Sequence, residues 1–492
     1  MSSYILSIDQ GTTSSRAIVF DEKLQIVGIS QKEIENFFPK PGWVEMSAET
    51  IYDSVVEVVK DVLIKTRIMP IEIKAIGITN QRETTIVWDR KTGKPVYNAL
   101  VWQSRQSNDL CEKVIRAGHS SYIKQKTGLT VDPYFSASKI RWILDHIEEG
   151  QLRALNGELI FGTVDSWLVY RLSNGRTHIT DVSNASRTML MDIDTLQWDK
   201  KLLDIWNIPA SMLPEIKASS EIYDHTDFLG VEIPIASVIG DQQSALFGQM
   251  CFEEGQCKNT YGTGCFLLFN TGKKRVDSKN GLVSTIAWKI GDEVYYALEG
   301  SVFVAGSAIQ WLRDGLKLIE TAPESEDKAS LVPDSGGVYV VPAFTGLGAP
   351  YWDQHARGAI FGLTRGTTRE HLIRATLESL AYQTYDVIEA LENDTGISVK
   401  GLQVDGGACR NNLLMQFQSD ILHAEIIRPV NFETTALGAC MLAGLATGAF
   451  SSLSDLRLMY NVDRRFEPMI SIAHQSRLVN GWKKAVRATM EY

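Results

Sequence analysis

The sequence predicts an α/β protein of two large domains, with ligands bound in the cleft between them. Its 492 residues are too many for one ordinary hydrophobic core. Predicted strands and amphipathic helices are mixed in both halves of the chain. A pattern of strand, Gly/Thr turn and strand opens the chain and returns near Gly255. We therefore expect one architectural unit used twice, in domains covering residues 1–250 and 251–492.

Local patterns predict the individual elements. YILSID, SRAIVFD and QIVGISQ are β-rich runs separated by turn residues, which predicts a meander at the start of the chain. GQCKNTY and CFLLFNT repeat this arrangement on either side of GTG. Apolar residues at helical spacing predict helices over 48–68, 301–318, 370–393 and 411–422. Short apolar runs predict strands over 75–79, 159–162, 337–341 and 401–404, which indicates two sheets.

Charge and hydropathy argue against nucleic acid or a membrane as a partner. The hydrophobic fraction is 44% and the charged fraction 22%, as in soluble globular proteins. The net charge of −10 disfavours nonspecific binding to polyanions, which requires a basic surface. The most membrane-like segment, 434–450, is rich in Gly and Ala and predicts a close-packed buried helix rather than a membrane span.

The cysteines and the first residues predict a cytoplasmic location. MSSYILSIDQGTTSS has no basic stretch followed by an apolar one, so it does not predict a secretory signal. The six cysteines are scattered and none forms CxxC, which predicts free thiols in a reducing compartment. The eight histidines are also dispersed, so no zinc site is expected.

The first candidate motif is DQGTTSSR at residues 9–16. A carboxylate ends a predicted strand, a glycine lets the backbone approach a ligand, and four hydroxyl groups follow. Such a turn offers phosphate oxygens many donors without large side chains. The alternative is a polar hairpin turn with ordinary Thr and Ser hydrogen bonds.

Two further turns carry glycines next to predicted strands. YGTG at 261–264 lies between two strands, and VDGGACRNN at 404–412 lies between an apolar run and a helix. Alone, the first is equally typical of a structural turn, and the second of an Asn-capped helix. The patterns GxxxxGK[ST] and GxGxxG after a strand are both absent, which excludes the common P-loop and Rossmann sites. Phosphate binding therefore requires separate turns to converge.

In this order, DQGTTSSR, YGTG and DGGACRNN resemble the phosphate and adenosine motifs of the actin/hexokinase/Hsp70 ATPase superfamily. Within it the chain resembles the FGGY carbohydrate kinases nearly end to end, through ITNQRETTIVWD, DPYFSASKIRW, IGDQQSALFGQ and PAFTGLGAPYWD among others. The resemblance implies two ribonuclease H-like (actin-type) domains around a central cleft. The first domain is expected to bind the substrate and phosphates, and the second the nucleotide. The implied activity is transfer of phosphate from ATP, with Mg²⁺, to glycerol.

The resemblance implies a polyol site that includes five side chains. Arg82 donates and Glu83 accepts, so together they can hold two neighbouring hydroxyls. In isolation this pair would be read as a surface ion pair. Trp102 and Phe266 are expected to pack against the carbon atoms of the polyol, and Tyr134 to offer its hydroxyl. Each of these aromatic residues would otherwise be read as core packing.

Asp241 and Gln242, within IGDQQ, complete the implied site. Asp241 is the implied base for the attacking hydroxyl, since phosphoryl transfer needs mainly positioning and neutralisation of charge. The alternative role for Asp241 is a helix N-cap. Asp9 is the carboxylate implied to position Mg²⁺, through water. The implied nucleotide contacts are Thr12, Thr13, Ser14, Arg16, Thr263, Gly306, Gln310, Gly407 and Asn411.

A regulatory site is implied at His225, in the segment 219–234. Gram-positive relatives carry a histidine here that accepts phosphate from a phosphocarrier of the sugar phosphotransferase system. Asp224 and Asp227 flank His225 and would repel a phosphate, so an inert surface histidine is the alternative. The segment contains no arginine, which argues against inhibition by fructose 1,6-bisphosphate. The resemblance also implies a homodimer or homotetramer.

Two other functions remain open from the sequence. A sister kinase acting on xylulose, ribulose or gluconate would share the nucleotide residues and differ in the substrate wall. A nucleotide-dependent binding protein related to actin or to chaperones would need neither that wall nor Asp241.

Overall fold

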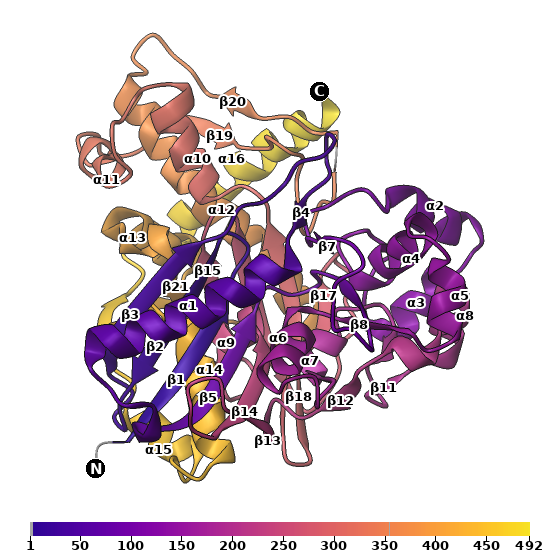
Figure 1. The fold of residues 1–492 in the computed structure, drawn as a ribbon. Helices are drawn as coiled ribbons and strands as arrows, with labels where there is room; N and C mark the ends of the chain where they lie inside the picture. Colours follow the sequence, from indigo (N-terminus) through magenta and orange to yellow (C-terminus); the bar gives the residue numbers. More distant parts are fainter. Residues whose placement is uncertain (1–2, 354) are drawn as a thin grey trace.

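One large twisted sheet runs through the computed structural model, which describes residues 3–353 and 355–492 (Figure 1). The sheet has 13 strands in the order β23-β22-β21-β15-β16-β18-β17-β13-β14-β5-β1-β2-β3. Its N-terminal strands are β1 (Tyr4–Gln10), β2 (Ser14–Phe20), β3 (Ile26–Glu33), β5 (Ile73–Asn80), β13 (Ser220–Thr226) and β14 (Ile233–Gly240). Its C-terminal strands are β15 (Cys257–Tyr261), β16 (Cys265–Gly272), β17 (Val283–Ile290), β18 (Glu293–Val302), β21 (Gly401–Asp405), β22 (Glu425–Pro429) and β23 (Val462–Phe466).

The two halves repeat one strand order, as the sequence predicts. Antiparallel β3-β2-β1 continue into parallel β5 and β14 and then antiparallel β13. Antiparallel β18-β16-β15 continue in the same way into β21, β22 and β23. The two expected sheets are joined at one pair of residues, Ser220 on β13 and Ile290 on β17.

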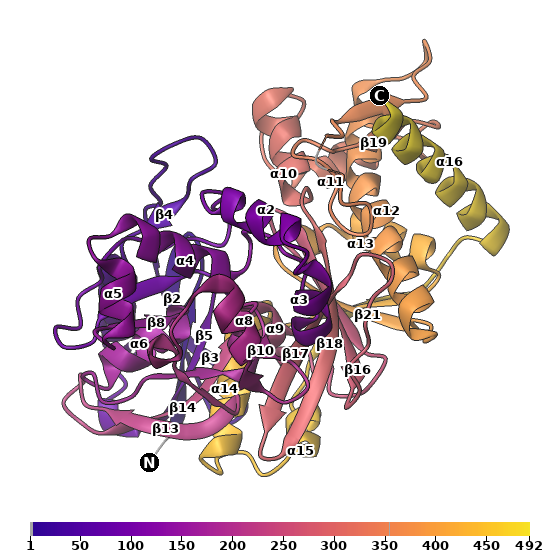
Figure 2. The same cartoon turned by 90° about the vertical axis from the view of Figure 1, so that its right-hand side faces the viewer.

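Helices cover both faces, and most lie where the sequence predicts them. α1 (Ala48–Thr66) begins at Ser47, whose side chain accepts from the N–H of Thr50 at 3.2 Å. α12 (Arg369–Thr395) and α13 (Asn412–Leu422) also match their predicted spans. Figure 2 shows the N-terminal half on the left, with α12 and α16 (Ile472–Glu491) of the C-terminal half on the right.

The predicted helix over 301–318 is wrong at its start. Ser301 and Val302 still belong to β18, where they pair with Phe266 and Cys265. The chain becomes helical only in α10 (Gly306–Gln310), followed by a π-helical turn over Trp311–Gly315. Pairing with a neighbouring strand, which local periodicity does not report, prevailed here over helix propensity.

The Gly/Ala-rich segment forms a buried helix, α14 (Thr434–Ala446), as predicted. It packs against α9 (Asp241–Gly248) and the N-terminal strands, so it ties the C-terminal half to the other one. A Cβ on Gly438 would lie 2.0 Å from the carbonyl oxygen of Ser244, so only glycine permits this approach. No described helix is both long and apolar enough to cross a bilayer.

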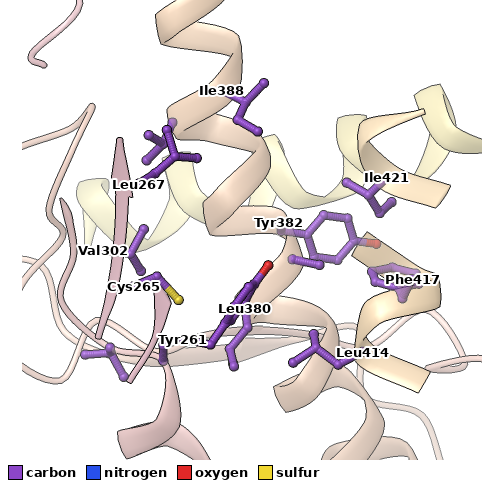
Figure 3. Close-up of a cluster of buried hydrophobic side chains, with 14 of the residues drawn as sticks. Tyr261, Cys265, Leu267, Val302, Leu380, Tyr382, Ile388, Leu414, Phe417 and Ile421 are labelled. Atoms are coloured by element: carbon purple, nitrogen blue, oxygen red, sulfur yellow. The ribbon is translucent and has the colours of Figure 1, made fainter. Parts of the chain in front are cut away.

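The C-terminal core fixes the second glycine turn. Figure 3 shows Leu380, Tyr382 and Ile388 of α12 among buried side chains of the neighbouring strands and of α13. The hydroxyl of Tyr261, which opens the turn, donates to Gln418 Oε1 at 2.5 Å. The turn therefore rests on a packed helix layer. All six cysteines are buried free thiols, consistent with their predicted lack of disulfides.

Candidate active site

The predicted first phosphate turn, within residues 9–16, connects β1 to β2. The N–H of Gly11 donates to the carbonyl oxygen of Ser14 at 2.9 Å, which closes the turn, and Thr13 is exposed. Arg16 crosses to the other half, with Nη1 2.8 Å from Glu433 Oε2. Burial raises the pKa of Asp9 to about 7, opposed by Arg16 and assisted by the nearby carboxylates of Asp241 and Glu433. These charges place the turn close to Asp241 and to the C-terminal half.

The residues of the C-terminal half that are predicted to bind the nucleotide lie close together. The N–H groups of Ala305 and Gly306 donate to the carbonyl oxygens of Thr263 and Gly262, both at 2.9 Å. Gly306 thus starts α10 directly against the YGTG turn, with Gln310 exposed at the end of the same helix.

The third turn lies against the second. Gly406, at φ +86°, packs on Tyr261, since a Cβ there would lie 2.4 Å from its carbonyl oxygen. Gly407 is exposed with open space at its Cα. Asn411 caps α13, because its side chain accepts from the N–H of Leu414 at 2.9 Å. The Asn-capped helix, which was the alternative interpretation of this motif, is therefore present. Asn411 still lies where the third turn meets α13.

Asp241 is the first residue of α9, and Gly240 is its N-cap. The alternative of an Asp N-cap is therefore wrong. The Oδ1 atom of Asp241 accepts from the N–H of Gln242 at 2.7 Å and lies 3.3 Å from Arg82 Nε. Its side chain is 28% exposed, and within the described chain no donor reaches Oδ2. Burial raises the pKa of Asp241 and the guanidinium of Arg82 lowers it. Oδ2 is therefore available to accept a proton, as a general base requires.

Arg82 and Glu83 belong to a buried network of four charges. Arg82 Nη1 and Nη2 lie 2.5 and 3.0 Å from the two carboxylate oxygens of Glu299. Arg187 Nε lies 2.6 Å from Glu83 Oε1, and its Nη2 lies 3.1 Å from Glu299 Oε1. All four side chains are at most 2% exposed. The surface ion pair considered for Arg82 and Glu83 is thus wrong.

The backbone at Glu83 supports a functional role. Glu83 has φ +60°, a left-handed conformation that is uncommon for any residue but glycine and that concentrates at functional sites. Arg187 occupies Oε1 of its carboxylate, while no hydrogen bond within the described chain uses Oε2. Glu83 therefore keeps one acceptor available next to Asp241 and Arg82.

Three aromatic side chains form a corner beside these charges. The ring of Trp102 lies 5.6 Å from that of Tyr134 and 6.4 Å from that of Phe266, both edge to face. Burial raises the pKa of Tyr134, so its hydroxyl stays protonated. Trp102 Nε1 donates to Thr12 Oγ1 at 2.8 Å. The corner thus joins the first phosphate turn to the charged network.

Comparison with known proteins decides the family. The model of the N-terminal domain of the FGGY family of carbohydrate kinases matches residues 4–248, and that of its C-terminal domain matches 257–447. The chain belongs to the FGGY family of carbohydrate kinases. Among its relatives, the glycerol kinase of Geobacillus kaustophilus is 59% identical and that of Thermus thermophilus 58%, each over 100% of both chains.

Solved structures show the same FGGY fold. The crystal structure of Plasmodium falciparum glycerol kinase with ADP superposes with a TM-score of 0.94 at 40% identity, covering 99% of this chain and 98% of that one. Xylulose kinase from Lactobacillus acidophilus superposes with a TM-score of 0.89 at 23% identity, covering 99% of this chain and 98% of that one. At that identity the second match shows the fold alone.

Three charged residues of this FGGY site were missed from the sequence. Lys258 is buried on β15, with Nζ 2.5 Å from Gln242 Oε1 and 2.8 Å from Thr260 Oγ1, and burial lowers its pKa to about 8. Arg187 and Glu299 were the other two. Lys258 lies within the predicted strand GQCKNTY, where a charge among apolar residues is a usable signal, whereas Glu299 lies on β18, a strand that was not predicted from the sequence.

His225 lies on β13, which forms an antiparallel hairpin with β14. Its side chain is exposed. Asp224 beside it pairs with Arg176 at 3.2 Å, and Arg176 also donates to the carbonyl oxygen of His225 at 2.8 Å. A cation therefore accompanies the flanking carboxylate that was expected to repel a phosphate.

Proposed function

We propose that the chain is a glycerol kinase, which transfers the γ-phosphate of ATP to a terminal hydroxyl of glycerol and releases ADP. A bond forms between the hydroxyl oxygen and the γ-phosphorus, the bond from that phosphorus to the bridging oxygen breaks, and the hydroxyl proton passes to Asp241. The observation that carries the proposal is the free oxygen of Asp241 beside Arg82, with the aromatic corner on one side and the first phosphate turn on the other. Glycerol kinases are also 57–59% identical to the chain over at least 99% of its length.

The polyol residues divide their roles by chemistry. Arg82 Nε and the free oxygen of Glu83 suit two neighbouring hydroxyl groups, since one donates and the other accepts. Trp102 and Phe266 cover the carbon atoms, and the Tyr134 hydroxyl donates to the substrate. Gln242, held by Lys258, orients the polyol. Phe266 and Glu299 come from the C-terminal half, so both halves of the chain contribute to the proposed polyol site. The other polyol residues lie within 1–250, the domain that was predicted to bind the substrate.

For the nucleotide, we assign the phosphates to Thr12, Thr13, Ser14, Arg16 and Thr263, and the adenosine to Gly306, Gln310, Gly407 and Asn411. Asp9 fits a role toward Mg²⁺, because a carboxylate oxygen is a hard ligand and Asp241 lies close enough to affect its ionisation. Asp9 would hold the ion through water. Bound Mg²⁺ supplies positive charge that offsets charge on the phosphates. Closure of the two halves would exclude water and limit hydrolysis of ATP.

A panel of polyols and ketoses, with ADP release coupled to a dehydrogenase signal, tests the proposal. We expect glycerol to be turned over and the product to have the mass of glycerol phosphate. Turnover of xylulose, ribulose or gluconate in place of glycerol would indicate the sister kinase. ADP release that no small substrate stimulates would indicate the nucleotide-dependent binding protein.

We further propose that His225 accepts phosphate from a phosphocarrier of the sugar phosphotransferase system, supported by its exposure and by Arg176 beside it. Incubation with the phosphorylated carrier, followed by mass spectrometry under alkaline conditions, should add one phosphate that His225→Ala lacks. If the wild-type chain gains no phosphate, His225 is an inert surface histidine. The proposed kinase is cytoplasmic and assembles as a homodimer or homotetramer, which sedimentation would distinguish.

A further inference from the structure

Trp102 contacts both binding regions of the site. Its ring forms the aromatic corner with Tyr134 and Phe266, on the polyol side. Its indole Nε1–H donates to Thr12 Oγ1 at 2.8 Å, on the first phosphate turn 90 residues earlier in the chain. One side chain therefore spans the distance between the two expected substrates.

This hydrogen bond determines which role the Thr12 hydroxyl oxygen plays. An indole N–H can only donate, so Thr12 Oγ1 acts as the acceptor in this bond. The single hydroxyl proton of Thr12 is then left to donate to another group. No residue that the structure describes accepts it. Phosphate oxygens are acceptors, so the hydroxyl is set to donate to a phosphate on the turn.

The backbone of Trp102 makes a second connection to the same turn. Its N–H donates to Thr84 Oγ1 at 3.2 Å, and the Thr84 hydroxyl donates to Gln81 Oε1 at 2.8 Å. The Gln81 side-chain amide in turn donates to the carbonyl oxygen of Gly11 at 3.1 Å. Thr84 and Gln81 are fully or almost fully buried, so this chain of hydrogen bonds holds the turn and Trp102 in a fixed relation.

We propose that Trp102 is a positioning residue that couples the binding of the two substrates. A polyol packed against the indole restricts the ring and with it the Thr12 hydroxyl, so the phosphates meet a donor that is already oriented. Since such coupling is reciprocal, the nucleotide must strengthen polyol binding by the same factor. The inference rests on the proposed function, because it takes glycerol as the polyol and ATP as the nucleotide.

Trp102→Phe tests the coupling, because it keeps an apolar ring and removes the N–H. Calorimetric titration with Mg²⁺ and an imido analogue of ATP, with and without saturating glycerol, gives the coupling as a ratio of dissociation constants. For the wild type we expect glycerol to tighten the analogue about 3- to 10-fold, the effect of one hydrogen bond. In Trp102→Phe the ratio should fall to about 1.

Trp198→Phe is the matched control. Trp198 is also half-buried, and its Nε1 donates to the carbonyl oxygen of Pro214 at 2.8 Å, outside the site. This variant should keep the wild-type ratio. A ratio that survives in Trp102→Phe, or is lost equally in Trp198→Phe, would overturn the inference.

A double-mutant cycle with Thr12→Val separates positioning from general disturbance. If Trp102 acts through Thr12, then Trp102→Phe should cause no further loss of coupling in the Thr12→Val background. Additive losses would overturn the inference. Glycerol-dependent ADP release by the wild type is measured in parallel. Its absence refutes the proposed function, whereas its presence with unchanged coupling in Trp102→Phe refutes this inference alone.

Discussion

Replacing Glu299 by Gln should destabilise the protein far more than replacing a comparable buried glutamate. Burial alone would raise the pKa of Glu299, yet Arg187 and Arg82 lower it from 4.5 to about 2. A drop of that size corresponds to about 3 kcal/mol of unfolding free energy, at the lower end of the cost of breaking a buried ion pair. Because the folded-state pKa is depressed, this stabilisation is present above pH 4.5 and is lost as the pH falls through about 2.

Thermal unfolding at pH 7 measures the effect. For a domain of about 150–250 residues, a loss of about 3 kcal/mol lowers the melting temperature by roughly 6–12 °C. The matched control is Glu378→Gln on α12. Glu378 is 3% exposed and pairs with Arg374 at 2.9 Å, but burial raises its pKa, so its charge is already unfavourable. The control should therefore melt within about 2 °C of the wild type.

The same variant should weaken the polyol site. With Gln at 299, Arg82 loses the carboxylate that holds both of its terminal nitrogens, and its Nε is no longer fixed beside Asp241. We expect the KM for glycerol to rise at least about 10-fold, from the loss of one charge-assisted hydrogen bond. Equal melting temperatures for Glu299→Gln and wild type, or equal losses in both glutamate variants, would refute this account of the network.

Three further predictions concern other parts of the site and the fold. Burial raises the pKa of Asp9 to about 7, so its ionised fraction falls between pH 8 and pH 6. The apparent affinity of the enzyme–ADP complex for Mg²⁺ should therefore weaken about 10-fold over this range. Equal affinities at the two pH values would exclude Asp9 from holding Mg²⁺. Lys258→Met removes the donor that holds Gln242, so the KM for glycerol should rise about 5-fold while that for ATP changes little, and an unchanged glycerol KM would contradict this. Gly438→Ala should prevent soluble expression, because its Cβ would lie 2.0 Å from a carbonyl oxygen. Gly366→Ala should express normally, because its Cβ would lie 3.7 Å from Thr364 Oγ1, an ordinary van der Waals contact.

The sequence predicted the architecture well because its signals are local. Apolar spacing located α1, including its buried Val55 and Val58, and the Gly/Ala composition of α14 correctly indicated a close-packed helix. The repeated turn pattern correctly indicated a duplicated unit. The failure at Ser301 has a non-local cause, because that residue is held in β18 by its pairing with Phe266 on β16.

The site could be predicted only where a motif carries the information. Arg82 and Glu83 were predicted from QRETT to bind the polyol, and that role stays a prediction, but their burial and their partner Glu299, 217 residues from Arg82, were not predicted. No spacing rule connects residues at such separations, because tertiary folding alone brings them together. The bond from Trp102 to Thr12 was invisible for the same reason, although both residues had been assigned to the site separately.

In the proposed reaction, Asp241 takes the proton of the attacking hydroxyl at a site where the predicted phosphate turns meet. Asp241→Asn keeps the size of the side chain and its contact with the N–H of Gln242, and removes the basic oxygen. The measurement is glycerol-dependent ADP release by this variant, together with its affinity for ATP. If Asp241 is the base, kcat should fall about 10²- to 10⁴-fold while ATP affinity is largely retained. Activity within a few-fold of the wild type would contradict it.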